Sequence, residues 1–86
     1  MSHPTQMNGL PLVYAVLFEA PGKRFVSSSH TKIERARAVV REEVRFLSPD
    51  WKLYLVKLEV PGIYSQFGPL PRFEILEGPV AGTQRI

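Results

Sequence analysis

Polar and apolar residues alternate along this chain with two different periods. Residues 12–19, LVYAVLFE, form a short and almost uninterrupted apolar run, rich in β-branched and aromatic side chains. Such a run is typical of a central strand that is buried on both faces. Pro21 and Gly22 follow, and this pair favours a type II turn in which the glycine has a positive φ. Residues 24–29 then predict a short, polar second strand.

Residues 31–47 change to the helical period. Apolar side chains recur there at spacings of three and four and form one stripe: Ile33, Ala36, Val40, Val44 and Leu47. Val39 and Phe46 widen this stripe on one side. This pattern predicts an amphipathic helix that packs one face on a sheet, with Val40 in the middle of the buried stripe.

Capping signals predict both ends of this helix. Thr31 and Glu34 have the spacing of a capping box, in which the hydroxyl and the carboxylate each accept a backbone N–H at the first turn. At the other end, Pro49 disfavours a helical conformation at Ser48. We therefore expect the helix to begin at Thr31 and to stop before Ser48.

Residues 51–60 alternate and predict the longest strand. One face would carry Tyr54, Val56, Leu58 and Val60, and the other Trp51, Leu53, Leu55, Lys57 and Glu59. Pro61 and Gly62 predict a second turn with a positive φ at the glycine. After an irregular stretch, residues 72–77 alternate again, with Phe73 and Ile75 on one face, and predict a last strand.

The order of these elements, β-β-α-β-β, predicts an α+β fold. One antiparallel sheet of three or four strands would carry a single helix on one face. We expect the helical stripe to pack against Val13 or Tyr14, Val56 and Ile75. The domain would span residues 10–77, between a flexible N-terminal tail (1–9) and a flexible C-terminal tail (78–86).

Length and composition narrow the class of protein. A single domain of 86 residues is marginally stable, so a homodimer that extends the core or pairs strands between subunits is an alternative to a monomer. The chain has no cysteine, which excludes disulfides and cysteine-ligated metal sites. Its longest apolar run, residues 10–18, is about half the length of a membrane span and follows no basic residue. We therefore expect no membrane insertion and a cytoplasmic location.

Residues able to carry catalysis are few. The chain has one aspartate, Asp50, and two histidines, His3 and His30. The stretch SSSH at 27–30 could form a Ser–His pair, although serines there are more typical of an edge strand. Two distant histidines do not make a metal site, and no glycine-rich phosphate loop is present. We expect a protein that is not an enzyme and has no catalytic residues, metal or cofactor.

Charge provides the candidate binding residues. The net charge is +3, and Arg37, Arg41 and Arg45 recur every fourth residue along the helix. We call these three residues the arginine ridge. Two interpretations remain open: a solvated face that is salt-bridged to neighbouring glutamates, or a surface that binds acidic groups. The ridge, with Lys52 and Lys57 on the following strand, forms the predicted partner-binding set.

These observations predict a small non-enzymatic module that binds a protein partner, as an accessory or inhibitory protein would. The alternative is a nucleic-acid-binding protein that uses the arginine ridge of the helix. A third hypothesis is a purely structural subunit of a larger assembly. Trp51 and Tyr54 would not form one base-stacking platform, because residues three apart on a strand face opposite sides. A steep dependence of affinity on salt would distinguish nucleic acid from protein.

Overall fold

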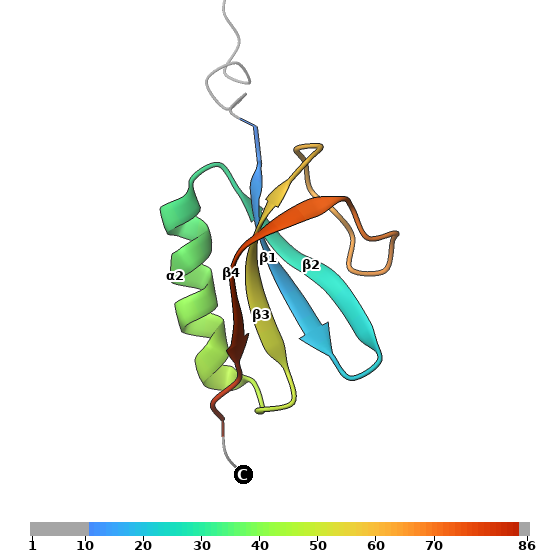
Figure 1. The fold of residues 1–86 in the computed structure, drawn as a ribbon. Helices are drawn as coiled ribbons and strands as arrows, with labels where there is room; N and C mark the ends of the chain where they lie inside the picture. The colour runs from blue at the N-terminus through green and yellow to red at the C-terminus, as the bar shows by residue number, and fades with distance from the viewer. Residues whose placement is uncertain (1–10, 85–86) are drawn as a thin grey trace, which may run out of the picture.

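The computed structural model describes residues 11–84, so the tail predicted at residues 1–9 lies outside the described residues. Its α+β architecture confirms the predicted order β-β-α-β-β (Figure 1). The elements are β1 (Tyr14–Ala20), β2 (Lys23–His30), α2 (Ile33–Glu43), the short 3-10 helix η1 (Val44–Phe46), β3 (Lys52–Leu58) and β4 (Phe73–Ala81).

All four strands form one antiparallel sheet in the order β2-β1-β3-β4. The apolar run at the start of the chain becomes β1, an inner strand, as its two apolar faces predict. Both β2 and β3 are antiparallel to β1 and therefore parallel to each other, so α2 is the crossover between them. Ala20 pairs with Lys23 across a two-residue turn, and Gly22 has φ +82° as predicted. Gly62 also has a positive φ, +152°.

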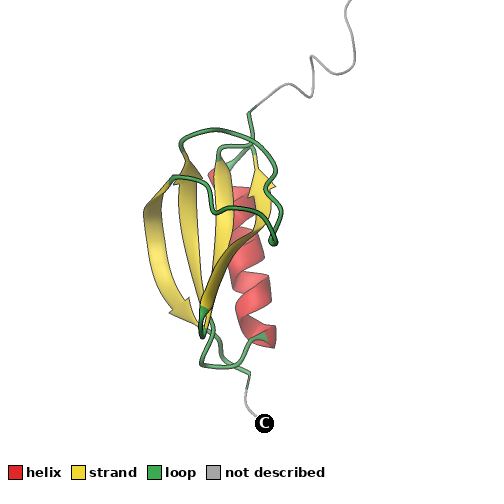
Figure 2. Cartoon of the chain, turned by 90° about the vertical axis from the view of Figure 1, so that its right-hand side faces the viewer, coloured by secondary structure: helices red, strands yellow, loops and turns green. Residues whose placement is uncertain are grey.

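The sheet separates two apolar clusters (Figure 2). On the side that we call the helix face, α2 covers Val16, Phe18, Leu53 and Leu55. On the opposite side, the loop face, the cluster consists of Ala15, Leu17, Val26, Tyr54, Val56 and Leu58, and the connection between β3 and β4 passes over it. Figure 2 shows the helix behind the sheet and this connection in front of it.

The helical stripe is confirmed, but part of its predicted partner set is wrong. Ile33, Ala36, Val40, Val44 and Leu47 all pack on the helix face, with Ala36 fully buried and Tyr14 among their neighbours. Val56 and Ile75, however, pair with each other across β3 and β4 on the loop face. Because β3 is apolar on both faces, its alternation does not tell which face receives the helix.

Both helix ends differ from the prediction. The N-cap residue is Lys32, in an extended conformation, and no side chain caps the helix. Thr31 therefore lies one residue too early for the capping box, and the Lys32 carbonyl accepts the N–H groups of Arg35 (3.2 Å) and Ala36 (3.4 Å). At the other end the α-helix stops at Glu43 and tightens into η1. Phe46, predicted to widen the stripe, is 63% exposed.

The last strand continues four residues past its predicted end at 77. It runs to Ala81, so residues 78–81 belong to the sheet and not to a tail. Beyond them, the N–H groups of three residues bind carbonyls around the end of the helix: Gly82 to Trp51 (2.8 Å), Thr83 to Val44 (3.0 Å) and Gln84 to Leu47 (2.7 Å). The prediction was wrong because Gly78 and Pro79 are common strand terminators, whereas here the pairing with β3 resumes beyond them.

Candidate interaction surfaces

The arginine ridge lies on α2 and η1 and is partly neutralised by glutamates. Arg37 donates from Nε (2.8 Å) and Nη2 (2.5 Å) to the Glu77 carboxylate on β4. This hydrogen bond raises the pKa of Arg37 and lowers that of Glu77. Arg45 lies 3.9 Å from Glu42, one turn back. Arg41 is exposed and has no ion pair among residues 11–84.

The two predicted lysines do not join this ridge. Lys52 alternates with Tyr54 and so lies on the loop face, opposite Glu19 of β1. Lys57 alternates with Leu55 and lies on the helix face, near the other end of β3, between Tyr14 and Glu74. The five predicted binding residues are therefore divided between two faces of the sheet and do not form one surface.

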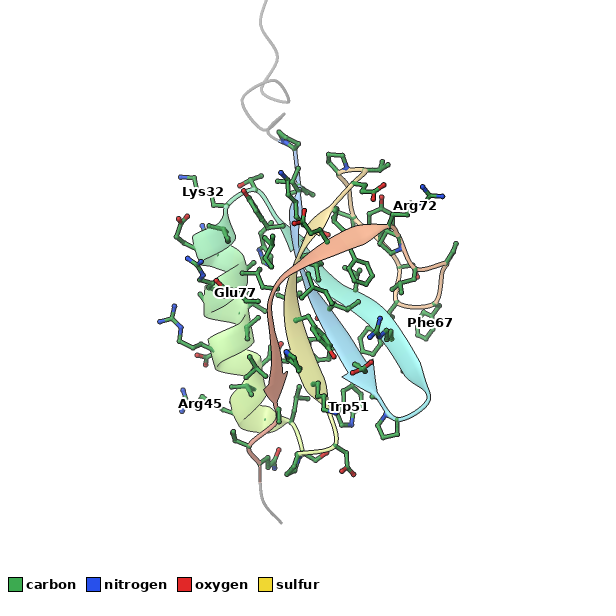
Figure 3. All side chains as sticks on the ribbon, in the orientation of Figure 1. Lys32, Arg45, Trp51, Phe67, Arg72 and Glu77 are labelled. Carbon is green, nitrogen blue, oxygen red and sulfur yellow. The ribbon has the colours of Figure 1, made fainter. Side chains whose placement is uncertain are left out.

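A surface that the sequence did not indicate lies on the connection between β3 and β4. Within it, Val60 (65%), Ile63 (84%), Phe67 (88%) and Leu70 (42%) are exposed. We call residues 60–70 the apolar segment. In Figure 3, Phe67 lies beside β2, on the opposite side of the molecule from Arg45 and Glu77. From the sequence, residues 63–71 are predicted to be irregular, and this prediction does not tell which of their side chains are exposed. The available signal was its large apolar residues, which follow no period that would bury them.

One aromatic residue anchors the apolar segment to the sheet. Tyr64 packs against the loop-face cluster together with Phe73. Its hydroxyl donates to the Val60 carbonyl over 2.6 Å, which closes one turn of the segment. The Ser65 hydroxyl accepts the Phe67 N–H over 3.0 Å. These contacts hold the segment in place while Ile63 and Phe67 point outward.

Two hollows border the outer strand β2 on this side. The larger, about 720 Å³, is lined by the hairpin residues 19–24 and by Asp50, Lys52 and Leu70, and we call it the hairpin hollow. The smaller, about 370 Å³, lies between residues 25–27 of β2 and residues 64–67, and we call it the edge hollow. Together they follow β2 from its hairpin end to its middle.

Two residues that line the hairpin hollow, Glu19 and Arg24, belong to a hydrogen-bonded cluster. Glu19 accepts hydrogen bonds from Arg24 Nε (2.8 Å) and from the Tyr54 hydroxyl (2.9 Å), and the Arg24 guanidinium lies 5.7 Å from the centre of the Tyr54 ring. The bond to Arg24, followed by that to Tyr54, lowers the pKa of Glu19, and the bond to Glu19 raises the pKa of Tyr54. The Glu19 carboxylate thus stays ionised and is already bound on both oxygens.

Within the stretch SSSH at residues 27–30, one serine does pair with the histidine. Ser28 Oγ lies 2.8 Å from His30 Nε2, and both residues belong to the edge strand β2. Burial, and to a smaller extent the charge of Arg35, lower the pKa of His30. His30 is therefore neutral at pH 7, and the pair joins two side chains of one edge strand.

The aromatic residues named as stacking candidates belong to the two cores. Trp51 lies edge-on to Phe18 and Phe25, with ring centroids 6.1 and 6.2 Å apart. Tyr54 is buried on the other face of the sheet. Neither ring is displayed as an open platform for a nucleic-acid base.

The chain matches no protein-family model, no curated protein and no solved structure. None of the helices within residues 11–84 has the length and apolar character needed to cross a membrane. In the same part of the chain, histidine, aspartate and glutamate side chains do not gather into a group of three that could hold a metal ion.

Proposed function

We propose that this chain is a small non-enzymatic module that binds a protein partner through the apolar segment. The observation that carries the proposal is the exposure of Ile63 and Phe67, at 84% and 88%. Side chains of this size cost free energy in water unless a partner covers them, about 25 cal/mol for each Å² of apolar surface. Exposed apolar patches that are rimmed by polar residues commonly mark protein interfaces.

The composition of the surface favours protein over nucleic acid. Phe67 and Tyr64 bring aromatic rings to the segment, and aromatic residues are enriched in protein interfaces. Within residues 60–70, the sequence has no charged side chain, whereas a phosphate backbone requires Lys or Arg. An accessory or inhibitory protein, which acts by covering a site on another protein, is the form of this function that we propose.

A nucleic-acid partner on the arginine ridge is the second candidate. It is supported by Arg41, which is exposed and has no ion pair among the described residues, and by Lys32 and Arg35, which are exposed on the same helix. Neutralisation of Arg37 by Glu77 weighs against it. This alternative predicts a steep fall of affinity with salt, flattened by up to about three units in the Arg37, Arg41, Arg45→Ala triple variant.

Affinity capture from lysate of the native cell, with and without nuclease, tests the proposal. The bound protein is identified, purified and titrated against the wild type, Ile63→Ala and Phe67→Ala. Hot-spot residues, which cluster near the centre of an interface, cost about 2 kcal/mol or more when truncated to alanine. We propose that Ile63 and Phe67 are hot spots, so we expect about 30-fold weaker binding for each variant. Phe46→Ala, which removes an exposed phenylalanine at the end of the helix, is the matched control.

Three results would overturn the proposal. In the first, the captured material disappears after nuclease treatment. In the second, Ile63→Ala and Phe67→Ala both bind the partner as strongly as the wild type. In the third, the Phe46→Ala control loses as much affinity as the two segment variants. The first of these would favour the nucleic-acid alternative.

A further inference from the structure

We propose that β2 pairs with β2 of a second copy of this chain, antiparallel, so that the two sheets join into one continuous sheet. The two-fold axis of this homodimer would pass between Ser27 and Ser28 of both copies, perpendicular to the sheet. The interface is the backbone edge of β2, and the proposal goes beyond the binding of a protein partner through the apolar segment.

The first observation is that β2 is the open edge of the sheet. Natural edge strands are commonly protected against pairing by proline and by charged side chains. The opposite edge, β4, contains Pro79, which has no N–H to donate. Strand β2 contains no proline, and its lysine and arginine, Lys23 and Arg24, both lie at the hairpin end. Residues 25–30 carry no charge at pH 7, because His30 is neutral there, so this stretch is available for pairing.

The second observation is which backbone groups of β2 point away from the sheet. In a two-residue hairpin, the residues that flank the turn bond to each other, so Lys23 directs its N–H and C=O to Ala20 of β1. Every second residue of β1 repeats this pairing. Its partners on β2 therefore also face inward: Phe25, Ser28 and His30. The outward groups are those of Arg24, Val26 and Ser29.

The spacing of these outward groups fits a second copy. Val26 and Ser29 are three residues apart, because the bulge between them inserts Ser27, whereas a regular strand presents outward groups two residues apart. A regular peptide would therefore fall out of register at the bulge. A second copy, rotated by 180° about the proposed axis, has the same bulge at the same place. Val26 of each copy then meets Ser29 of the other.

The side chains at these positions agree with the pairing. Val26 belongs to the loop-face cluster, and Ser29 pairs with Ala15 of the same cluster. Residues that lie opposite each other on neighbouring strands share one face of the sheet, so this pairing brings two loop-face positions together.

Charge favours the antiparallel direction. Parallel pairing would set Lys23 and Arg24 of one copy beside the same two residues of the other, and such like charges are destabilising when they lie opposite each other. In the antiparallel arrangement, the two copies of Arg24 lie at opposite ends of the paired stretch. They are then seven residues, or about 20 Å, apart along the strands.

The dimer would place both loop faces on the same side, because its axis is perpendicular to the sheet. Phe67 lines the edge hollow together with residues 25–27 of β2, and it is 88% exposed in a single copy. The two Phe67 rings would therefore lie on either side of the axis. The apolar segments of the two copies would form one surface.

Cysteine cross-linking tests the position of the axis, because the chain has no cysteine of its own. Ser27 is exposed, and its Cα would lie about 6 Å from the Cα of Ser27 in the second copy, within the range that a disulfide spans. Oxidation of the full chain with diamide should therefore cross-link Ser27→Cys at least about 10-fold faster than Ala38→Cys, an exposed position on the helix. Lys23→Cys should react no faster than Ala38→Cys, because the two hairpins are far apart.

Two results of this experiment would overturn the proposal. In one, Ser27→Cys and Ala38→Cys cross-link at the same rate. In the other, Lys23→Cys cross-links as fast as Ser27→Cys, which would indicate parallel strands or a contact between hairpins.

Sedimentation velocity tests the dimer without a new covalent bond. The wild type should shift from monomer to dimer as its concentration rises. Ser27→Lys, which places two ammonium groups beside the axis, should raise the dissociation constant at least about 10-fold. Ala38→Lys adds the same charge on the exposed side of the helix and should dimerise as the wild type does. A wild type that stays monomeric up to the concentration of an NMR sample, or a dimer that folded Ser27→Lys does not weaken, overturns the proposal. If Ser27→Lys does not fold, the cross-linking of Ser27→Cys decides.

The outcomes keep the dimer apart from the proposed function. If Ile63→Ala and Phe67→Ala bind the captured partner fully while Ser27→Cys cross-links at the axis, the dimer stands and the proposed function is wrong. If those two variants lose the partner while the wild type is monomeric, the proposed function stands and the dimer is wrong.

Discussion

The two faces of the sheet are covered in different ways. On the helix face, an amphipathic helix matches the apolar surface of β1 and β3, and its stripe packs inward. On the loop face, a connection without regular structure covers the core with Tyr64, while Ile63 and Phe67 face outward. The helix buries one stripe of apolar side chains and leaves its charged side chains in solvent. The connection between β3 and β4 packs one large side chain, Tyr64, against the core and leaves its other large side chains exposed. The helix face is closed by this packing, whereas the loop face leaves apolar surface exposed, and this is the surface that we propose binds a partner.

The largest effect is expected at the contact between helix and sheet. Ala36 is fully buried there, and Ala36→Asp would place an unpaired carboxylate in the core. This costs several kcal/mol in a domain that has about 5 to spare, so we expect it to unfold. Ala38 is exposed on the same helix, and Ala38→Asp should change stability by only about 0.5 kcal/mol. Thermal denaturation measures both. Equal midpoints would show that the helix does not pack through this stripe.

The next largest effect on stability is expected just after β4, where Gly82 lies against the end of the helix. A Cβ at Gly82 would overlap the carbonyl oxygens of Leu47 and Ser48. We expect Gly82→Ala to destabilise the fold by about 1–3 kcal/mol in chemical denaturation. Gly68→Ala, which meets only ordinary contacts, is the control. A frayed tail beyond residue 77 would instead make the two variants equally stable.

A smaller effect is expected at the hairpin that holds β2 beside the loop face. Gly22 has φ +82°, and a Cβ there would meet nothing within 4 Å. We therefore expect Gly22→Ala to destabilise the fold only through the strain of a positive φ, by about 1 kcal/mol. The same Gly68→Ala control applies, since Gly68 does not have a positive φ. No difference between these variants in urea would rule out the turn geometry described for the hairpin.

The smallest effect is expected on the exposed side of the helix, at Arg37 and Glu77. Arg37 lowers the pKa of Glu77 below its ordinary value of 4.5. A carboxylate whose folded pKa is depressed stabilises the fold above its unfolded pKa and loses this contribution as the pH falls through the folded pKa. In Arg37→Ala, the pKa of Glu77 measured by NMR should rise, and acid should affect stability less. An unchanged pKa would mean that the ion pair does not form in solution.

Much of the fold could be predicted from the sequence because its elements have clear periods. The stripe from Ile33 to Leu47 and the alternation in residues 51–60 predicted α2 and β3 directly. The face that receives the helix could not be predicted, because Leu55 and Val56 are equally apolar neighbours on opposite sides of β3. The contacts of Gly82 with the helix end are long-range and have no local signature.

The candidate surface could be predicted only in part. The arginine ridge was visible as a repeat, but its pairing with Glu77 joins residues 40 apart in sequence. The spacing of Lys52 and Lys57 already placed them on opposite faces of one strand. The apolar segment could not be predicted because its apolar residues follow neither a helical nor a strand period. Without such a period, the sequence does not show which apolar side chains are buried and which face water.

The central claim is that the loop face, and not the arginine ridge, binds the partner. The most direct test is the affinity of the purified partner for two folded variants: Ile63→Ala with Phe67→Ala, and the triple variant Arg37, Arg41, Arg45→Ala. We predict that the double variant loses at least 30-fold, while the triple variant changes by less than about 10-fold and mainly in its association rate. Loss of binding by the triple variant, with full binding by the double variant, would contradict this account.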